Sequence, residues 1–156
     1  MKPKKVLTVA VLVLGISVAY YSMNAAPVAS DQTYSYHGGT AWHSNYTEAT
    51  QIAQEEDKPM LLYFWATWCT YCEDYNQKVY TDEEVRDELD DYVLVGVNMD
   101  RNDEVTERLK REYDANYPPQ HVVLSPEGEV VREINGYADK ETFLNILEAS
   151  QAKGGV

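Results

Sequence analysis

Residues 60–72 read MLLYFWATWCTYC, and this stretch decides the fold class. Residues 60–66 are all apolar or aromatic, a pattern that is typical of a central strand buried on both faces. The two cysteines of the chain, Cys69 and Cys72, follow in a turn, and the polar stretch 73–78 predicts that a helix continues from there. The sequence therefore predicts a C-x-x-C pair at a strand-to-helix junction.

Strand and helix patterns alternate along the rest of the chain. Apolar spacing and capping residues predict further helices at 42–53, after a capping box at 81–84, at 103–113 and after Asp139. Apolar runs predict strands at 93–97 and 120–124, and turn residues at 125–128 join the second of these to a strand at 129–134. We therefore expect an α/β fold with a mixed central sheet flanked by helices.

The beginning of the chain has the pattern of an export segment. Three lysines occur within the first five residues, and residues 6–21 are uncharged and almost wholly apolar. This run is longer than most signal-peptide cores and shorter than the roughly 20 residues of a spanning helix, so residues 1–26 are either a signal peptide or a membrane anchor. Small and polar residues predict a flexible tether over 27–39, and the globular domain is expected over 40–152.

The lysines at the start also indicate a compartment. Positive charge next to an apolar segment tends to stay in the cytoplasm, which sends the rest of the chain to the outer side of the membrane. We expect a protein of the periplasm or the cell surface, either secreted or anchored to the membrane by its first segment, in an oxidising environment.

Charge and cysteine content exclude several classes of function. The formal net charge is −13, and all 26 acidic residues follow residue 30, so the domain lacks the basic footprint that nucleic acids require. Two cysteines exclude a disulfide-stapled mini-fold and a four-thiolate metal site within one chain. A zinc site would need His37, His43 or His121 beside both thiolates, and their spacing matches no zinc module. We expect no metal and no nucleic-acid partner.

The position of the cysteine pair predicts its chemistry. A helix that begins near Cys69 directs unpaired N–H groups and the positive end of its dipole at the sulfur, which favours thiolate over thiol. Cys69 is therefore the expected nucleophile and the more exposed sulfur, and Cys72, on the same helix face, can attack a mixed disulfide formed there. No separate cofactor is required. A purely structural disulfide would close so short a loop that it stabilises by only about 2 kcal/mol.

Several motifs together resemble the thioredoxin superfamily. They are Trp42 with its following helix, the Lys58–Pro59 step, the W-C-x-x-C segment at 68–72 with the strand before it, and the Tyr117-Pro118-Pro119 step before a hairpin. The resemblance is to the C-terminal thioredoxin-like domain of the bacterial thiol-disulfide interchange reductases and to exported single-domain relatives, over about residues 40–150. It implies a thioredoxin-like fold and a thiol-disulfide oxidoreductase that acts on protein thiols and disulfides.

The resemblance also implies roles for the residues around the cysteines. Cys69 matches the attacking cysteine, Cys72 the resolving one, and Trp68 the aromatic residue that flanks the active site. Tyr71, between the cysteines, is expected either to contact a substrate or redox partner or to cover Cys72.

A second part of the implied site is the proline step. Pro119 matches the family's cis-proline, which lies beside the cysteine pair, and the residue before it offers backbone hydrogen bonds to an extended substrate strand. Here that residue is Pro118, which has no N–H group, so only its carbonyl can serve a substrate.

The sequence departs from the family at two positions where the family has acids that take part in proton transfer. Six residues before the attacking cysteine the family has a buried acid, and this chain has Tyr63. Seven residues after that cysteine the interchange domain has a further acid, and this chain has Asn76. Glu73 and Asp74 either substitute for these acids or are solvated charges on a helix face. His121 is either a structural histidine or a proton shuttle.

The resemblance favours catalysis in the reducing direction, with electrons received from a membrane protein. A disulfide oxidase or isomerase remains an alternative, since the Thr70–Tyr71 pair does not fix the redox potential. A thioredoxin-like interaction module at the membrane, without catalysis, is the alternative from another class.

Overall fold

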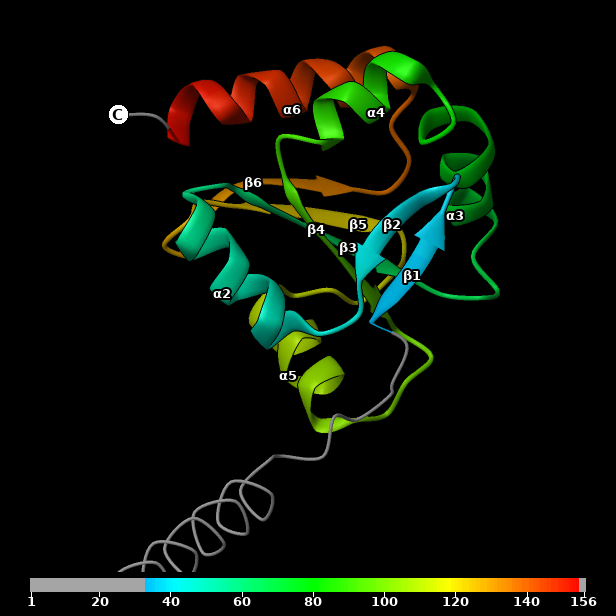
Figure 1. Ribbon diagram of the computed structural model, residues 1–156. Helices are drawn as coiled ribbons and strands as arrows, with labels where there is room; N and C mark the ends of the chain where they lie inside the picture. The colour runs from blue at the N-terminus through cyan, green and yellow to red at the C-terminus, as the bar shows by residue number, and fades with distance from the viewer. Residues whose placement is uncertain (1–32, 155–156) are drawn as a thin grey trace, which may run out of the picture. The chain divides into compact units, whose positions relative to one another are not determined.

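A six-stranded mixed sheet forms the centre of the fold (Figure 1). The structure is a computed structural model that describes residues 33–154. The strands, in the spatial order β1-β2-β4-β3-β5-β6, are β1 (Tyr34–His37), β2 (Thr40–His43), β4 (Val93–Asn98), β3 (Met60–Trp65), β5 (Gln120–Leu124) and β6 (Val130–Asn135). The helices are α2 (Tyr46–Glu56), α3 (Thr70–Asp74), the π-helix η1 (Tyr75–Val79), α4 (Glu83–Leu89), α5 (Glu104–Glu112) and α6 (Lys140–Gly154). The expected α/β architecture is confirmed.

Strand β3 organises the sheet from its middle. It pairs in parallel with β4, where Leu62 lies opposite Val95, and antiparallel with β5, where Leu62 lies opposite Val122. Because side chains alternate along a strand, Leu61 and Tyr63 join the core on one face, whereas Leu62 and Phe64 join the core on the other. The uninterrupted apolar run of β3 is thus explained by burial on both faces.

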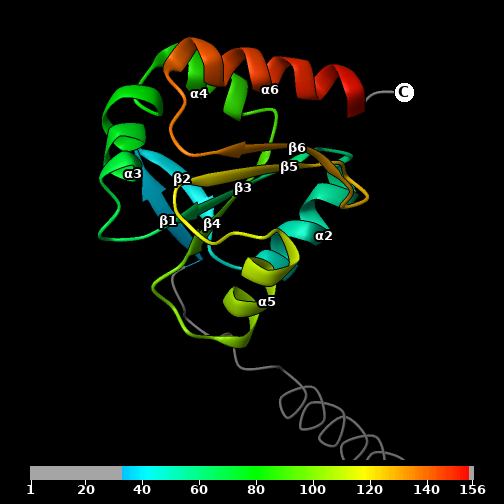
Figure 2. The same ribbon diagram turned by 180° about the vertical axis from the view of Figure 1, so that it is seen from behind.

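Helices cover both faces of the sheet. Figure 1 shows α4 and α6 on one side and α2 and α5 on the other, and Figure 2 shows the same separation from behind. The first face packs Val85, Leu89, Phe143 and Leu147 in the same core as both cysteines. The second face packs Ala49, Ala53, Leu109 and Tyr113 against β3 and β4. The cysteine pair therefore belongs to the core beneath α4 and α6.

Helix starts follow the capping residues of the sequence, with one correction. Asp139 accepts a backbone N–H group at the start of α6, as expected, and Asp103, predicted as the first residue of a helix, is the residue that caps α5. The capping box predicted at 81–84 is wrong in its first residue, because Asp82 caps α4 by accepting the Glu84 N–H. The Thr81 hydroxyl instead donates to the Gln77 carbonyl of the preceding π-helix.

The N-terminal boundary of the domain differs from its predicted position more than the helix starts do. The predicted tether over 27–39 ends before Tyr34, because β1 and β2 form an antiparallel hairpin around Gly38 and Gly39. Trp42, predicted to lie in a helix, is in β2, and α2 begins only at Tyr46. The reason is tertiary, since Trp42 is fully buried and the short glycine turn permits the hairpin.

The predicted signal peptide or anchor over 1–26 lies outside the described residues. Within residues 33–154, none of the helices is both long enough and apolar enough to cross a membrane.

Gly38 is predicted to be the less replaceable of the two hairpin glycines. A Cβ atom there would lie 2.5 Å from Tyr80 Cβ and 2.9 Å from the Asn76 carbonyl oxygen, at a φ of +58°. Gly38→Ala should lower the free energy of unfolding by about 2–4 kcal/mol, measured by urea denaturation. The matched control is Gly39→Ala, where φ is also positive but nothing lies within 4 Å, so a smaller loss is expected. Equal losses of stability in the two variants would show that the positive φ alone, and not the contact with Tyr80 and Asn76, causes the destabilisation.

Candidate active site

The two cysteines form a disulfide at the start of α3. Cys69 is the N-cap residue, and its Sγ accepts the backbone N–H of Cys72 at 3.1 Å. The exposed fraction is 8% for Cys69 and 3% for Cys72, which is the order expected from the sequence. In the reduced protein, the same N–H group can stabilise a Cys69 thiolate, because a hydrogen bond to a charged acceptor is stronger than one to a neutral acceptor.

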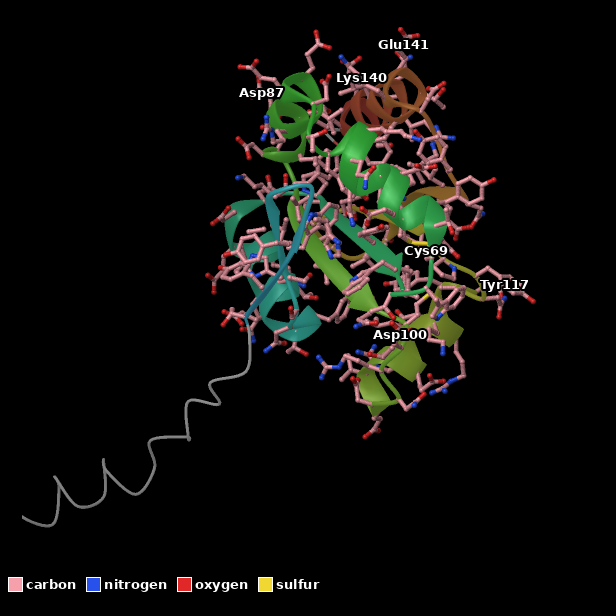
Figure 3. All side chains as sticks on the ribbon, turned by 90° about the vertical axis from the view of Figure 1, so that its right-hand side faces the viewer. Cys69, Asp87, Asp100, Tyr117, Lys140 and Glu141 are labelled. Carbon is pink, nitrogen blue, oxygen red and sulfur yellow. A yellow bond between two sulfur atoms is a disulfide. The ribbon has the colours of Figure 1, made fainter. Side chains whose placement is uncertain are left out.

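A carboxylate that the sequence reasoning did not single out holds the loop before the disulfide. Asp100 accepts the backbone N–H of Thr67 through Oδ2 at 2.8 Å, and this bond lowers the pKa of Asp100. Asp100 follows the carboxyl end of β4, which lies beside the end of β3, so the parallel pairing brings it to this loop. In Figure 3, Asp100 and Cys69 lie on the same side of the view. The sequence feature that could have identified Asp100 is its position just after a predicted buried strand.

Exposed aromatic side chains flank the disulfide. Trp68 is 68% exposed, Tyr71 58% and Tyr117 82%, unusually high values for large apolar side chains. Tyr71 stacks on Tyr137, with their ring centroids 5.9 Å apart. Figure 3 shows Tyr117 on the side of the molecule that carries Cys69. Exposed apolar surface rimmed by polar residues is typical of an interaction site.

The proline step lies at the same edge of the sheet as the disulfide. The Pro118–Pro119 peptide bond is cis, as the resemblance implies. Because β5 runs antiparallel to β3, the residues that precede Gln120 lie beside the end of β3, where the chain leads to Cys69. Pro119 is buried and its carbonyl accepts the Gly136 N–H at 2.9 Å, whereas Pro118 is half-buried.

The two acids that follow Cys72 have partners four residues later, on η1. Asp74 forms an ion pair with Lys78 at 2.7 Å, and Glu73 accepts a hydrogen bond from the Gln77 amide. Glu73 is exposed and Asp74 is half-buried. These contacts favour the interpretation of both as charges on a helix face.

A cluster of neutral polar side chains lies in the core that contains the cysteines. We call His37, Tyr63, Asn76, Tyr80 and His121 the buried polar cluster. Tyr63 stacks on its cross-strand partner His121 with the ring centroids 4.8 Å apart, and the Tyr80 hydroxyl is hydrogen-bonded to His121 Nε2. The His37 ring lies 5.1 Å from the Tyr63 ring. Tyr63 thus has histidines on two sides, and no carboxylate is part of the cluster.

Burial keeps the ionisable groups of this cluster uncharged at neutral pH. It lowers the pKa of His121 to about 3, with a further lowering by His37, and it lowers the pKa of His37 to about 4 against an opposing contribution from Asn76. It raises the pKa of Tyr63 and of Tyr80 well above the ordinary value of a tyrosine. A His121 with so low a pKa fits a structural role better than the storage of a proton.

One atom of the cluster has no hydrogen-bond partner. Among the described residues, His121 Nδ1 is buried and unpaired, whereas Tyr63 interacts with the Tyr80 side chain and Asn76 with the His37 side chain. An unpaired buried polar group costs about 1–3 kcal/mol of stability, so such groups are uncommon in native proteins. The sequence marked Tyr63 and Asn76 as departures from the family, and the structure brings both to one cluster with His37, which the sequence reasoning considered only as a zinc ligand.

Residues 33–154 contain no group of three or more His, Cys, Asp or Glu side chains that could hold a metal ion.

Comparisons with known proteins agree with this geometry. The family model of the thioredoxin-like domain matches residues 46–151. A thiol:disulfide interchange protein DsbD from Photorhabdus laumondii is 26% identical over 108 residues, which cover 67% of this chain and 19% of that protein. The chain therefore spans about a fifth of the length of this curated relative.

Solved structures with the same fold include two of bacterial origin. A thioredoxin from Thermus thermophilus has a TM-score of 0.65 and 30% identity, over 72% of this chain and 88% of that one. The reduced C-terminal domain of DsbD from Neisseria meningitidis has a TM-score of 0.61 and 24% identity, over 67% of this chain and 92% of that one.

The buried histidines predict a pH dependence of stability. Unfolded histidines take up protons near pH 6.5, whereas folded His37 and His121 have pKa values of about 4 and about 3, so the unfolded state binds more protons below pH 6.5. The free energy of unfolding should fall by about 1.5 kcal/mol per histidine between pH 6.5 and 5, measured by urea denaturation. His121→Gln should remove about half of this slope. A free energy that stays level over this range would contradict the assignment.

Proposed function

Because this chain belongs to the thioredoxin-like domain family, we propose that it is an exported thiol-disulfide oxidoreductase that exchanges disulfides with protein partners through Cys69 and Cys72. The observation that carries the proposal is the disulfide at the start of α3, with Cys69 Sγ bound to the Cys72 N–H group. This arrangement supplies a stabilised thiolate and a resolving thiol three residues later, which are the two groups that disulfide exchange requires.

In the reducing direction the cycle has two steps. The Cys69 thiolate attacks one sulfur of a substrate disulfide, and the other substrate sulfur leaves as a thiolate and takes up a proton. Cys72 then loses its proton and attacks Cys69 Sγ, which breaks the mixed disulfide and releases the second substrate thiol. Two electrons have passed to the substrate, and the pair ends as a disulfide, the state found in the structure.

The substrate site proposed around the pair consists of Trp68, Tyr71, Pro118 and Pro119. The two exposed aromatic side chains supply apolar contact area beside Cys69. Neither proline has an N–H group, and the Pro119 carbonyl already accepts the Gly136 N–H. The Pro118 carbonyl is therefore the group that can bind the backbone of an extended substrate. A substrate strand would therefore donate an N–H group to this site.

Direction and compartment are further parts of the proposal. The curated relatives are named as thiol:disulfide interchange proteins, and their likeness supports a reductase that obtains electrons from a membrane protein. The apolar segment 6–21 after three lysines supports export, with residues 1–26 as signal peptide or anchor. An oxidising compartment outside the cytoplasm needs such a reductase to reopen protein disulfides.

Reduction of insulin by dithiothreitol should be accelerated by the wild-type chain and not by Cys69→Ala. The physical reason is that only a sulfur at position 69 can form the mixed disulfide. The measurement is the turbidity that develops as insulin chains separate, with circular dichroism to show that the variant is folded. Equal curves for both proteins would favour a non-catalytic interaction module.

The reduction potential of the Cys69–Cys72 pair should lie near that of thioredoxin, at about −270 mV. It is measured by equilibration with glutathione or dithiothreitol buffers, followed by thiol alkylation and mass spectrometry. A potential near −120 mV, of the order found in strong oxidants, would overturn the reducing direction while leaving disulfide exchange intact.

A further inference from the structure

Strand β1 forms one outer edge of the central sheet. It pairs with β2 on one side, and among residues 33–154 no strand pairs with its other side. The edge of a sheet presents unpaired N–H and C=O groups, which can pair with a strand of another chain. The open side of β1 is therefore a surface on which a further strand can be added.

The two edges of the sheet differ in how they are protected against such pairing. The opposite edge strand, β6, carries Arg132 and Glu133, and its pairing with β5 is irregular between Val123 and Leu124. Charged side chains and bulges are two of the features that keep edge strands from pairing with other chains. β1 has the sequence YSYH, without charge or proline and with regular pairing to β2. Of these features, β1 has only its short length.

The β1–β2 hairpin is an uncharged part of an acidic chain. Residues 32–47 contain no Asp, Glu, Lys or Arg, whereas the whole chain has a formal net charge of −13. A basic partner would gain most from binding to the acidic faces. Two copies of this chain repel each other at those faces, and the repulsion is weakest where both surfaces are uncharged. The charge distribution therefore favours a second copy as the partner of this edge.

The backbone groups of two residues in β1 point away from β2. The Thr33 carbonyl accepts the Ser44 N–H at 2.9 Å, so this pair is a hydrogen-bonded position of the antiparallel ladder. Such positions alternate along a ladder with positions that are not hydrogen-bonded. Tyr34 and Tyr36 are therefore the residues whose N–H and C=O groups face the open edge.

The side chains of the same two residues are exposed. Tyr36 is 70% exposed and Tyr34 is 41% exposed. As alternate residues of one strand, they lie on the same face of the sheet, where the Tyr34 ring packs 4.8 Å from the ring of His43. The open edge thus combines free backbone groups with two aromatic side chains that offer apolar contact area.

We propose that β1 is a dimerisation edge, to which β1 of a second copy adds in antiparallel orientation. Ser35 of the two copies lies opposite itself on the two-fold axis. Tyr34 then faces Tyr36 of the second copy, and Tyr36 faces Tyr34 of the second copy. This register pairs both open residues of each strand, whereas any other two-fold register pairs only one of them within β1.

The dimer is expected to be weak and to leave the disulfides accessible. Aromatic cross-strand pairs stabilise antiparallel strands, but β1 has only four residues, so the dimer dissociates on dilution. In Figure 3 the blue hairpin and the labelled Cys69 lie on different sides of the view. Pairing at β1 therefore leaves both copies of Cys69 open to a substrate.

The test uses two matched double variants of the full chain, in a mild detergent that covers the apolar residues 6–21. Tyr34→Glu/Tyr36→Glu places like charges opposite each other across the proposed interface. Tyr34→Lys/Tyr36→Glu removes the same two rings but places each lysine opposite a glutamate. In any register that sets position 34 or 36 opposite itself, this second variant would also bring like charges together.

Sedimentation equilibrium over the micromolar range should show a dimer for the wild type. Tyr34→Glu/Tyr36→Glu should raise the dimer dissociation constant by about tenfold or more, because both cross-strand pairs become repulsive. Tyr34→Lys/Tyr36→Glu should stay within about threefold of the wild type. Circular dichroism shows that each variant is folded.

Amide hydrogen exchange provides a second measurement on the unaltered chain. In the wild-type dimer, the Tyr34 and Tyr36 amides should exchange about tenfold more slowly than in the dilute monomer, since they are then paired across the interface. The Ser35 and His37 amides face β2 in both states and should change little.

The outcomes distinguish this inference from the proposed function. A wild-type chain that stays monomeric overturns the proposal, as does a Tyr34→Glu/Tyr36→Glu variant that dimerises as tightly as the wild type. A Tyr34→Lys/Tyr36→Glu variant as dissociated as the double glutamate overturns the register and with it the proposal. All three proteins should accelerate insulin reduction equally, so loss of dimerisation leaves disulfide exchange in place.

Discussion

Burial of β3 on both faces is the constraint on which the rest of the structure depends. Helices close both faces of the sheet around this strand, and its neighbours within the sheet are β4, which is parallel, and β5, which is antiparallel. Its alternation then sends Tyr63 into the core that holds the disulfide and Phe64 into the opposite core. Its end delivers the chain to the loop before Cys69, where β4 and β5 contribute Asp100 and the proline step. The course of β3 thus determines both which core residues lie with the disulfide and which loops surround it.

The site combines an acidic exterior with a neutral interior. No carboxylate of residues 33–151 is among the buried side chains, although the chain has 26 acidic residues. Near the cysteines, the ion pair of Asp74 with Lys78 and the hydrogen bond that Asp100 accepts are at or near the surface. The sulfur chemistry is therefore governed by backbone N–H groups and neutral polar side chains, and little by buried charge.

The sequence predicted the parts of the fold that have strong local signals. The runs at 60–66 and 93–97 and the hairpin around 125–128 follow from apolar pattern and turn residues, and the capping residue Asp139 marks a helix start. The hairpin of β1 and β2 was missed because its four-residue strands have no clear pattern, and Trp42 fits a helical spacing by chance. The buried polar cluster could not be predicted, since it depends on contacts between β1, β3, η1 and β5.

The β1–β2 hairpin has a consequence for where this domain can be cut. The sequence places its start at residue 40, yet β1 carries His37 into the core, 3% exposed, against Tyr63 and Trp65. Truncation at residue 40 would delete this wall and expose aromatic rings that are now covered. It would also leave β2 as an unprotected edge strand, a template for intermolecular strand pairing. A truncated chain that keeps this core therefore has to include β1, from Tyr34 onward.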